Sequence, residues 1–163
     1  MTTKTPKPTP ITEWDPMAPL EPGTMLLEAS AGTGKTYNLV NWVLRLVVEY
    51  DIPIQEQVVV TFTRAATAEL KERIRVRLAE AAAVLSNRRA IDPSDGVLAR
   101  IVTAAREARL RNEDWLHRVT AAQESFDACP ISTIHGFCQR MLQHNAFEAQ
   151  TDFDLTLFPG LSF

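Results

Sequence analysis

Cysteine is scarce in this sequence, and long apolar runs are missing. The two cysteines among 163 residues, Cys129 and Cys138, are too few for a disulfide framework and match no zinc-ligand spacing. We interpret them as small apolar residues of a reduced protein. No apolar run is long enough to span a bilayer, and the N-terminus lacks the apolar core of a signal peptide. These absences exclude a disulfide-rich secreted protein and predict a cytoplasmic location.

An overall excess of positive charge is also absent. The net charge is -3 and the isoelectric point is near 5.6, which is not typical of a nucleic-acid-binding chain. Local charge differs, and we name the basic residues between 64 and 89 the basic stripe. Counterion release depends on local contacts, so the stripe is a candidate for binding a phosphate backbone. The alternative is a solvated helix face. The stripe consists of Arg64, Lys71, Arg73, Arg75, Arg77, Arg88 and Arg89, interspersed with Glu69, Glu72 and Glu80.

The chain has the composition of a globular protein, with 45% hydrophobic and 23% charged residues. Its length suffices for one domain but not for a two-lobed motor. Residues 1–20 begin with a Thr, Pro and Lys-rich stretch and are expected to form a disordered leader. Residues 21–158 form the expected domain, with a helical insertion at about 85–123. Residues 159–163 are expected to be a tail.

Apolar patterning predicts an alternation of strands and helices. The run Thr24–Ala29 is a candidate buried strand, and the β-branched run Val58–Thr63 is a second one, apolar enough to be buried on both faces. Between them, apolar residues recur at helical spacing. A strand, a helix and a strand in succession predict a parallel sheet. The helical positions are Val40, Val43, Leu44, Val47 and Val48.

The second half of the chain is predicted to be mostly helical. A long helix is expected at about Ala65–Leu85, with one apolar face, followed by a loop at Asn87–Gly96 and a helical stretch over Val97–Glu124. Cys129–Thr133 is a candidate third strand. A last helix then places Ile134, Phe137, Cys138, Met141 and Leu142 on one face.

The strongest chemical signal is the segment ASAGTGKT, which has the pattern of a phosphate-binding loop. Glycines let the backbone N–H groups of such a loop approach a triphosphate closely. The lysine reaches the β- and γ-phosphates, and the last threonine ligates Mg2+. The alternative is a Gly-rich turn without a ligand, which the position between a strand and a helix disfavours. The candidate ATP site is Ala29, Ser30, Ala31, Gly32, Thr33, Gly34, Lys35 and Thr36, with Thr36 as the Mg2+ ligand.

Two further motifs narrow the family. VVVTFTRAATAELKERI (Val58–Ile74) resembles motif Ia of the UvrD/Rep group of superfamily 1 DNA helicases. STIHGFCQRML (Ser132–Leu142) resembles the His-containing motif of that group, and NAFE (Asn145–Glu148) follows it. Within the group, the sequence is most similar to the RecB family, the beta subunits of RecBCD exonucleases. The resemblance implies an α/β, RecA-like P-loop NTPase fold, ATP and Mg2+ as cofactors, DNA as partner, and RecC- and RecD-like subunits beside the full-length parent.

The resemblance also implies DNA-contacting residues. By position these are Thr61, Phe62, Thr63, Arg64, Thr133 and His135. Phe62 would be a platform for stacking a base, but its place in an apolar strand also allows a core position. His135 could instead be a helix-start histidine bonded to the nearby backbone.

The residues that complete ATP hydrolysis are not evident. In these helicases an apolar strand ending in Asp-Glu binds Mg2+ and orients water, and no Asp-Glu pair occurs in this sequence. We therefore expect part of a recombinational repair helicase with an incomplete motor lobe, inactive alone: a truncated product, a fragment, or one piece of a split enzyme. The alternative is a nucleotide- or DNA-binding module without turnover.

Overall fold

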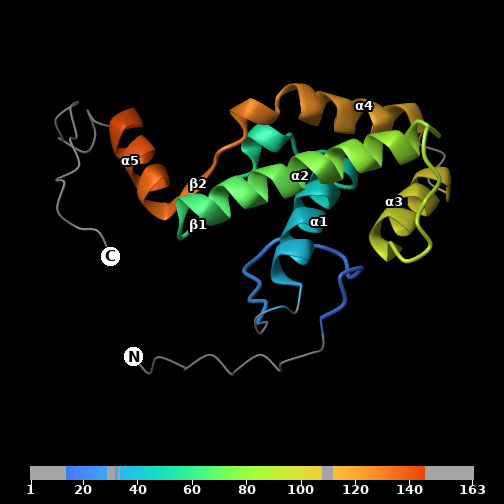
Figure 1. Cartoon of the computed structure of the whole chain (residues 1–163), viewed down its shortest axis with the longest axis horizontal. Coiled ribbons are helices and arrows are strands. Elements are labelled where there is room, and N and C mark those ends of the chain that lie inside the picture. The colour runs from blue at the N-terminus through green and yellow to red at the C-terminus, as the bar shows by residue number, and fades with distance from the viewer. Residues whose placement is uncertain (1–13, 29–31, 33, 108–111, 146–163) are drawn as a thin grey trace, which may run out of the picture.

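The computed structural model describes residues 14–28, 32, 34–107 and 112–145. Figure 1 shows α4 running alongside α2, α1 crossing beneath them, and α5 with the two strands at one end of the molecule. None of the helices in the described ranges has the length and apolar character of a transmembrane segment. In chain order the elements are α1 (Lys35–Val48), the 3-10 helix η1 (Ile54–Glu56), β1 (Val59–Thr61), α2 (Arg64–Leu85), α3 (Gly96–Glu107), α4 (Asn112–Glu124), the 3-10 helix η2 (Phe126–Ala128), β2 (Ile131–Thr133) and α5 (Ile134–His144).

Helix α1 confirms the predicted helix after the phosphate loop. Its apolar positions recur every three or four residues, so they form one stripe that faces α2 and α4. Burying each valine or leucine of this stripe stabilises the fold by about 1.5–3 kcal/mol relative to an exposed side chain. All five predicted positions are buried: Val40, Val43, Leu44, Val47 and Val48.

Helix α2 is the central element, and it begins one residue before the predicted helix. Its predicted apolar face is buried against α1 and α4. The segment predicted as a helical insertion contributes α3 and α4, with residues 108–111 outside the described ranges. The buried positions of α2 include Leu70, Ile74, Leu78, Ala81 and Leu85.

The two strands form a parallel pair, which agrees with the predicted parallel sheet. β1 pairs with β2, which lies within the predicted third strand Cys129–Thr133 and confirms it. The connection between the two strands runs through α2, α3 and α4. The prediction that the run Val58–Thr63 is buried on both faces of the sheet is wrong. Val59 is 8% exposed, whereas Val58 and Val60 are 54% and 43% exposed, because no element within the described residues covers their face of the sheet.

The predicted strand at Thr24–Ala29 is also not observed. Thr24–Glu28 has no regular secondary structure, and Leu26 is 82% exposed. An apolar run becomes a strand only where a neighbouring strand accepts its ladder hydrogen bonds. Within the described residues, β1 and β2 pair only with each other. Ala29 lies outside the described residues.

The expected disordered leader, residues 1–20, is too long, because residues 16–20 form hydrogen bonds with Arg45 and Tyr50. Residues 1–13 lie outside the described residues, as does the expected tail. Residues 14–20, which we name the strap, are not a free leader because they are hydrogen-bonded to α1 and its C-terminal turn. Arg45 donates to the carbonyl oxygens of Pro16 and Ala18, and the Leu20 N–H donates to the Tyr50 hydroxyl.

Candidate functional site

The described part of the phosphate loop has the backbone that the motif requires. Gly32 and Gly34 have φ of 80° and 87°, in the left-handed region that residues with a Cβ atom rarely adopt. Helix α1 begins at Lys35, so its first-turn N–H groups and the positive end of its dipole lie next to the loop. Lys35 is exposed and Thr36 is half-buried. The other predicted loop residues, Ala29, Ser30, Ala31 and Thr33, lie outside the described residues.

A cavity of about 170 Å³ joins the loop to the end of β1. Thr61 lines it together with Lys35 and Thr36, so residues of two separate motifs meet there. Glu69, which the sequence marks only as an acidic residue within the basic stripe, also lines the cavity, and its carboxylate pairs with Arg73 at 2.7 Å. A larger cavity of about 470 Å³ lies between the end of α1 and α4 and contains no residue of the loop. The small cavity is lined by Lys35, Thr36, Leu39, Thr61, Ala66, Glu69 and Leu70.

The donors in this cavity fit Mg2+ bound with a nucleotide. Mg2+ in such sites takes one or two protein oxygens, phosphate oxygens and water. The Thr36 and Thr61 hydroxyls and the Glu69 carboxylate are oxygen donors of this kind, and Lys35 supplies positive charge for phosphate. Within the described residues, no group of three or more His, Cys, Asp or Glu forms a metal site of its own. The cavity therefore suits a metal that arrives with phosphate.

The three predicted DNA-contacting threonines form hydrogen bonds at the starts of helices α2 and α5. The Thr63 hydroxyl accepts from the Ala66 N–H at 3.0 Å and caps α2. The Thr133 hydroxyl accepts from the Gly136 N–H at 3.1 Å and caps α5. The Thr61 hydroxyl donates to the Thr63 carbonyl oxygen at 3.1 Å. These bonds give the three side chains a structural role whether or not DNA is bound.

The remaining predicted DNA-contacting residues share one edge of the sheet. Thr61 and Thr133 are register partners at the carboxyl ends of β1 and β2, so the segments that follow them start side by side. Phe62 is 88% exposed, which excludes the core position that its strand context allowed. Arg64 and His135 are also exposed, each at the first turn of a helix.

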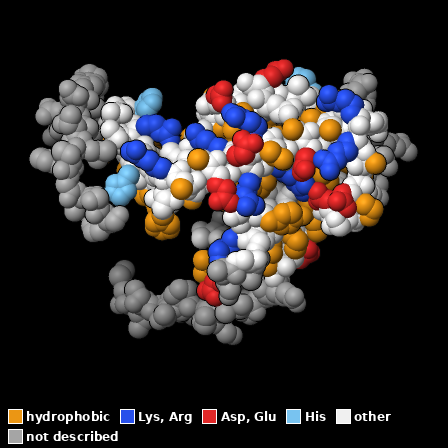
Figure 2. Space-filling model, viewed as in Figure 1, with side chains coloured by type: hydrophobic (Ala, Val, Ile, Leu, Met, Phe, Trp, Pro, Cys, Tyr) orange, Lys and Arg blue, Asp and Glu red, His pale blue; other side chains and the backbone are white. Residues whose placement is uncertain are grey.

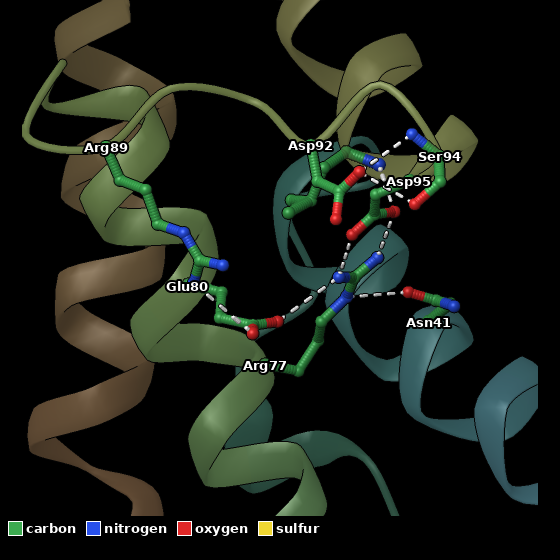
Figure 3. Close-up of polar contacts among 8 residues, drawn as sticks. Asn41, Arg77, Glu80, Arg89, Asp92, Ser94 and Asp95 are labelled. Carbon is green, nitrogen blue, oxygen red and sulfur yellow. Dashed lines mark hydrogen bonds and ion pairs between the residues drawn. The ribbon is translucent and has the colours of Figure 1, made fainter.

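The basic stripe is not a continuous cationic surface. Arg77 is 7% exposed, and its side chain points from α2 toward Asp95 and Asn41 (Figure 3). Its Nε donates to the Asn41 side chain at 2.8 Å, and its Nη2 to Asp95 at 2.8 Å. Glu80 bridges Arg77 and Arg89. Burial disfavours charged Arg77, but its hydrogen bonds to Asp95 outweigh this, so the pKa of Arg77 is raised.

Other members of the stripe are paired on the surface. Arg73 pairs with Glu69, and Arg75 pairs with Asp127 at 2.9 Å while its guanidinium lies 4.8 Å from the Phe126 ring centroid. Figure 2 shows Lys and Arg side chains interspersed with Asp and Glu on the face in view. A helical spacing in sequence cannot predict these partners, because Asp127 and Asp95 come from other segments. The basic stripe is therefore not one continuous cationic surface, because Arg77 is buried and Arg73 and Arg75 have acidic partners.

Comparison with known proteins defines the class. The UvrD/REP helicase N-terminal domain model matches residues 12–159, so the chain belongs to this family, the UvrD-type superfamily 1 helicases. Among its relatives are subunits of the RecBCD enzyme. The RecB subunit of Haemophilus influenzae is 38% identical over 158 residues, covering 88% of this chain and 13% of that protein. The RecB subunits of Escherichia coli and Mycolicibacterium smegmatis are 38% and 37% identical, covering 88% and 85% of this chain and 12% of each protein. The chain thus spans about an eighth of the length of these relatives.

Proposed function

We propose that this chain is the N-terminal ATP-binding part of an ATP-dependent DNA helicase and exonuclease subunit that acts in recombinational double-strand break repair. The observation that carries the proposal is the shared cavity of Lys35, Thr36 and Thr61, where the phosphate loop meets motif Ia. Lys35 would bind the β- and γ-phosphates, and the loop N–H groups would hold their oxygens. Thr36 would hold Mg2+, which neutralises phosphate charge when bound.

Calorimetric titration with Mg·ADP tests this proposal. The folded chain should release heat on binding, and Lys35→Ala should weaken binding by at least about tenfold, since a charged hydrogen bond is worth about 1.5–3 kcal/mol. Lys71→Ala is the matched control, because Lys71 is also exposed but lies on α2 and lines no part of the cavity. Absence of both heat and a thermal shift with the folded wild-type chain would refute nucleotide binding.

We further propose that single-stranded DNA binds along the edge where β1 and β2 end. Phe62 would stack on a base, and Arg64 and His135 would contact the strand or its backbone, beside Thr61, Thr63 and Thr133. Support comes from the exposure of Phe62 and from the register of the strands, which starts the two motifs side by side. In a full-length protein, RecC- and RecD-like subunits would be the partners, as the RecBCD names of the relatives suggest.

The second candidate function is nucleotide and DNA binding without efficient turnover by these 163 residues alone. The sequence contains no Asp-Glu pair, and an arginine finger alone contributes about 10³–10⁵ in rate. DNA-stimulated ATPase activity of the purified chain separates the two candidates. Phosphate release close to background in wild type and in Lys35→Ala supports the binding module. Robust release that Lys35→Ala abolishes would show that the catalytic set is complete.

A further inference from the structure

The strap is fastened to α1 at three successive turns of one helix face. Its first residue, Trp14, meets Asn38, and the Trp14 ring packs edge-on against Trp42, with centroids 5.2 Å apart and planes at 84°. One turn further, Arg45 donates to the Pro16 and Ala18 carbonyl oxygens. The strap therefore runs along α1 from the turn beside the phosphate loop toward the far end of the helix.

Trp14 is linked to the phosphate loop by a short chain of hydrogen bonds. The Trp14 Nε1–H donates to Asn38 Oδ1 at 3.1 Å. Asn38 Nδ2 donates to the Gly34 carbonyl oxygen at 3.1 Å, and the Asn38 backbone N–H donates to the same oxygen at 2.9 Å. Both ends of the Asn38 amide are thus satisfied, and its orientation is fixed by Trp14 on one side and Gly34 on the other.

We propose that Trp14 is a positioning residue for nucleotide binding that acts through Asn38 on the phosphate loop, an inference that rests on the proposed function. The Gly34 carbonyl and the Lys35 N–H belong to one planar peptide unit. Two donors on the Gly34 oxygen therefore fix the direction of the Lys35 N–H at the start of α1. Gly34, with φ of 87° and only the end of the Asn38 side chain near its Cβ position, would otherwise turn easily.

The strap does not depend on the Trp14 N–H for its attachment. Arg45 is 1% exposed and holds two strap carbonyls while it pairs with Glu49 at 2.9 Å. Losing the Trp14 N–H alone should therefore leave the strap in place and change the phosphate loop. Trp14→Phe keeps an aromatic ring beside Trp42 and removes the N–H donor together with one ring of the indole.

Mg·ADP titration of the full chain tests the relay. Trp14→Phe should bind about 2- to 10-fold more weakly, while its thermal midpoint should fall by only about 2–4 °C, the loss expected for one neutral hydrogen bond. Trp42→Phe is the matched control, because the Trp42 indole N–H is buried without a hydrogen-bond partner, and its affinity should equal that of wild type. Asn38→Ala should weaken binding, and Trp14→Phe added to Asn38→Ala should cause no further loss.

A fluorescence measurement reads the same contact directly. Substituting both Trp42 and Trp115 by Phe leaves Trp14 as the single tryptophan of the chain. Its emission should change on saturation with Mg·ADP, at a concentration that Lys35→Ala shifts upward. If wild type binds Mg·ADP but Trp14→Phe binds equally well, or the Trp14 emission stays constant, the relay is wrong while the proposed function stands. If wild type itself does not bind, the proposed function fails.

Discussion

Arg77 on α2 and Asp95 before α3 form a two-point ion pair that ties the loop between these helices to the core. Both Nη atoms of Arg77 donate to the Asp95 carboxylate, and the Arg77 Nε donates to Asn41 on α1. Asp95 also accepts from the Leu98 N–H at 3.1 Å at the start of α3. The Arg77–Asp95 pair therefore connects α1, α2 and α3.

Asp95→Asn should destabilise the chain by about 3 kcal/mol, because it removes the two-point counterion of the buried Arg77 charge and leaves only Glu80, at 3.4 Å. Urea unfolding measures the loss. Asp127→Asn is the control, since Asp127 is 95% exposed and its pair with Arg75 should contribute at most about 1 kcal/mol. Equal losses for the two variants would contradict the structural role of the buried pair.

The same pair predicts a dependence on pH. The hydrogen bond from Arg77 lowers the pKa of Asp95 below its ordinary value of 3.8. A lowered carboxyl pKa contributes stability that is fully present above the unfolded-state pKa and is lost as the pH falls through the folded-state pKa. The unfolding free energy of wild type should therefore exceed that of Asp95→Asn by a constant amount near neutral pH, and the two should converge below pH 3.8. If the difference in unfolding free energy between wild type and Asp95→Asn grew toward acid pH, the predicted lowering of the Asp95 pKa would be contradicted.

Phe62→Ala should leave the unfolding free energy within about 0.5 kcal/mol of wild type, since the ring is 88% exposed. If Phe62 stacks on a base, single-stranded DNA binding should weaken by about 1–3 kcal/mol. Fluorescence anisotropy with a labelled oligonucleotide measures the DNA affinity. The affinity for Mg·ADP should not change. Val76→Ala is the control, because Val76 is also an exposed apolar residue but lies on α2, and this variant should bind DNA like wild type. Undiminished DNA binding by Phe62→Ala removes the stacking role.

Thr133→Ala should cost about 1 kcal/mol of stability, because the Thr133 hydroxyl caps α5. Thr133→Ser keeps the hydroxyl and should restore the cap. Helical content and thermal midpoints check both variants. If Thr133→Ala were as stable as wild type but bound DNA more weakly, the hydroxyl would serve DNA rather than the helix.

The two cysteines should differ in reactivity. Burial raises the pKa of the Cys129 thiol to about 11, so little thiolate forms near pH 8, whereas Cys138 is exposed. Iodoacetamide should add one group to the native chain, on Cys138, and two groups to the denatured chain, as mass spectrometry would show. Rapid alkylation of native Cys129 would mean that its environment opens.

Sequence periodicity predicted the buried faces of α1 and α2 because a helix repeats its own geometry. It could not predict contacts between distant segments. Phe62 looked like core because alternation in a strand does not reveal which face has a neighbour. Leu26 looked like a strand residue because apolar character does not reveal a pairing partner. The sequence places Trp14 in the expected leader, because its hydrogen-bond partner Asn38 lies 24 positions away and local patterns do not reveal such a contact. Glu69 lines the same cavity as Lys35 and Thr36 because α2 packs beside α1, and this contact cannot be predicted from the local sequence.

Helix α5 rests on the ends of β1 and β2, and none of its residues is buried. Its backbone amides are therefore shielded by little besides their own intrahelical bonds. In deuterium exchange, α5 should open and label well before α2, at a small fraction of the global unfolding free energy. The segment that carries His135 would then sample open states often.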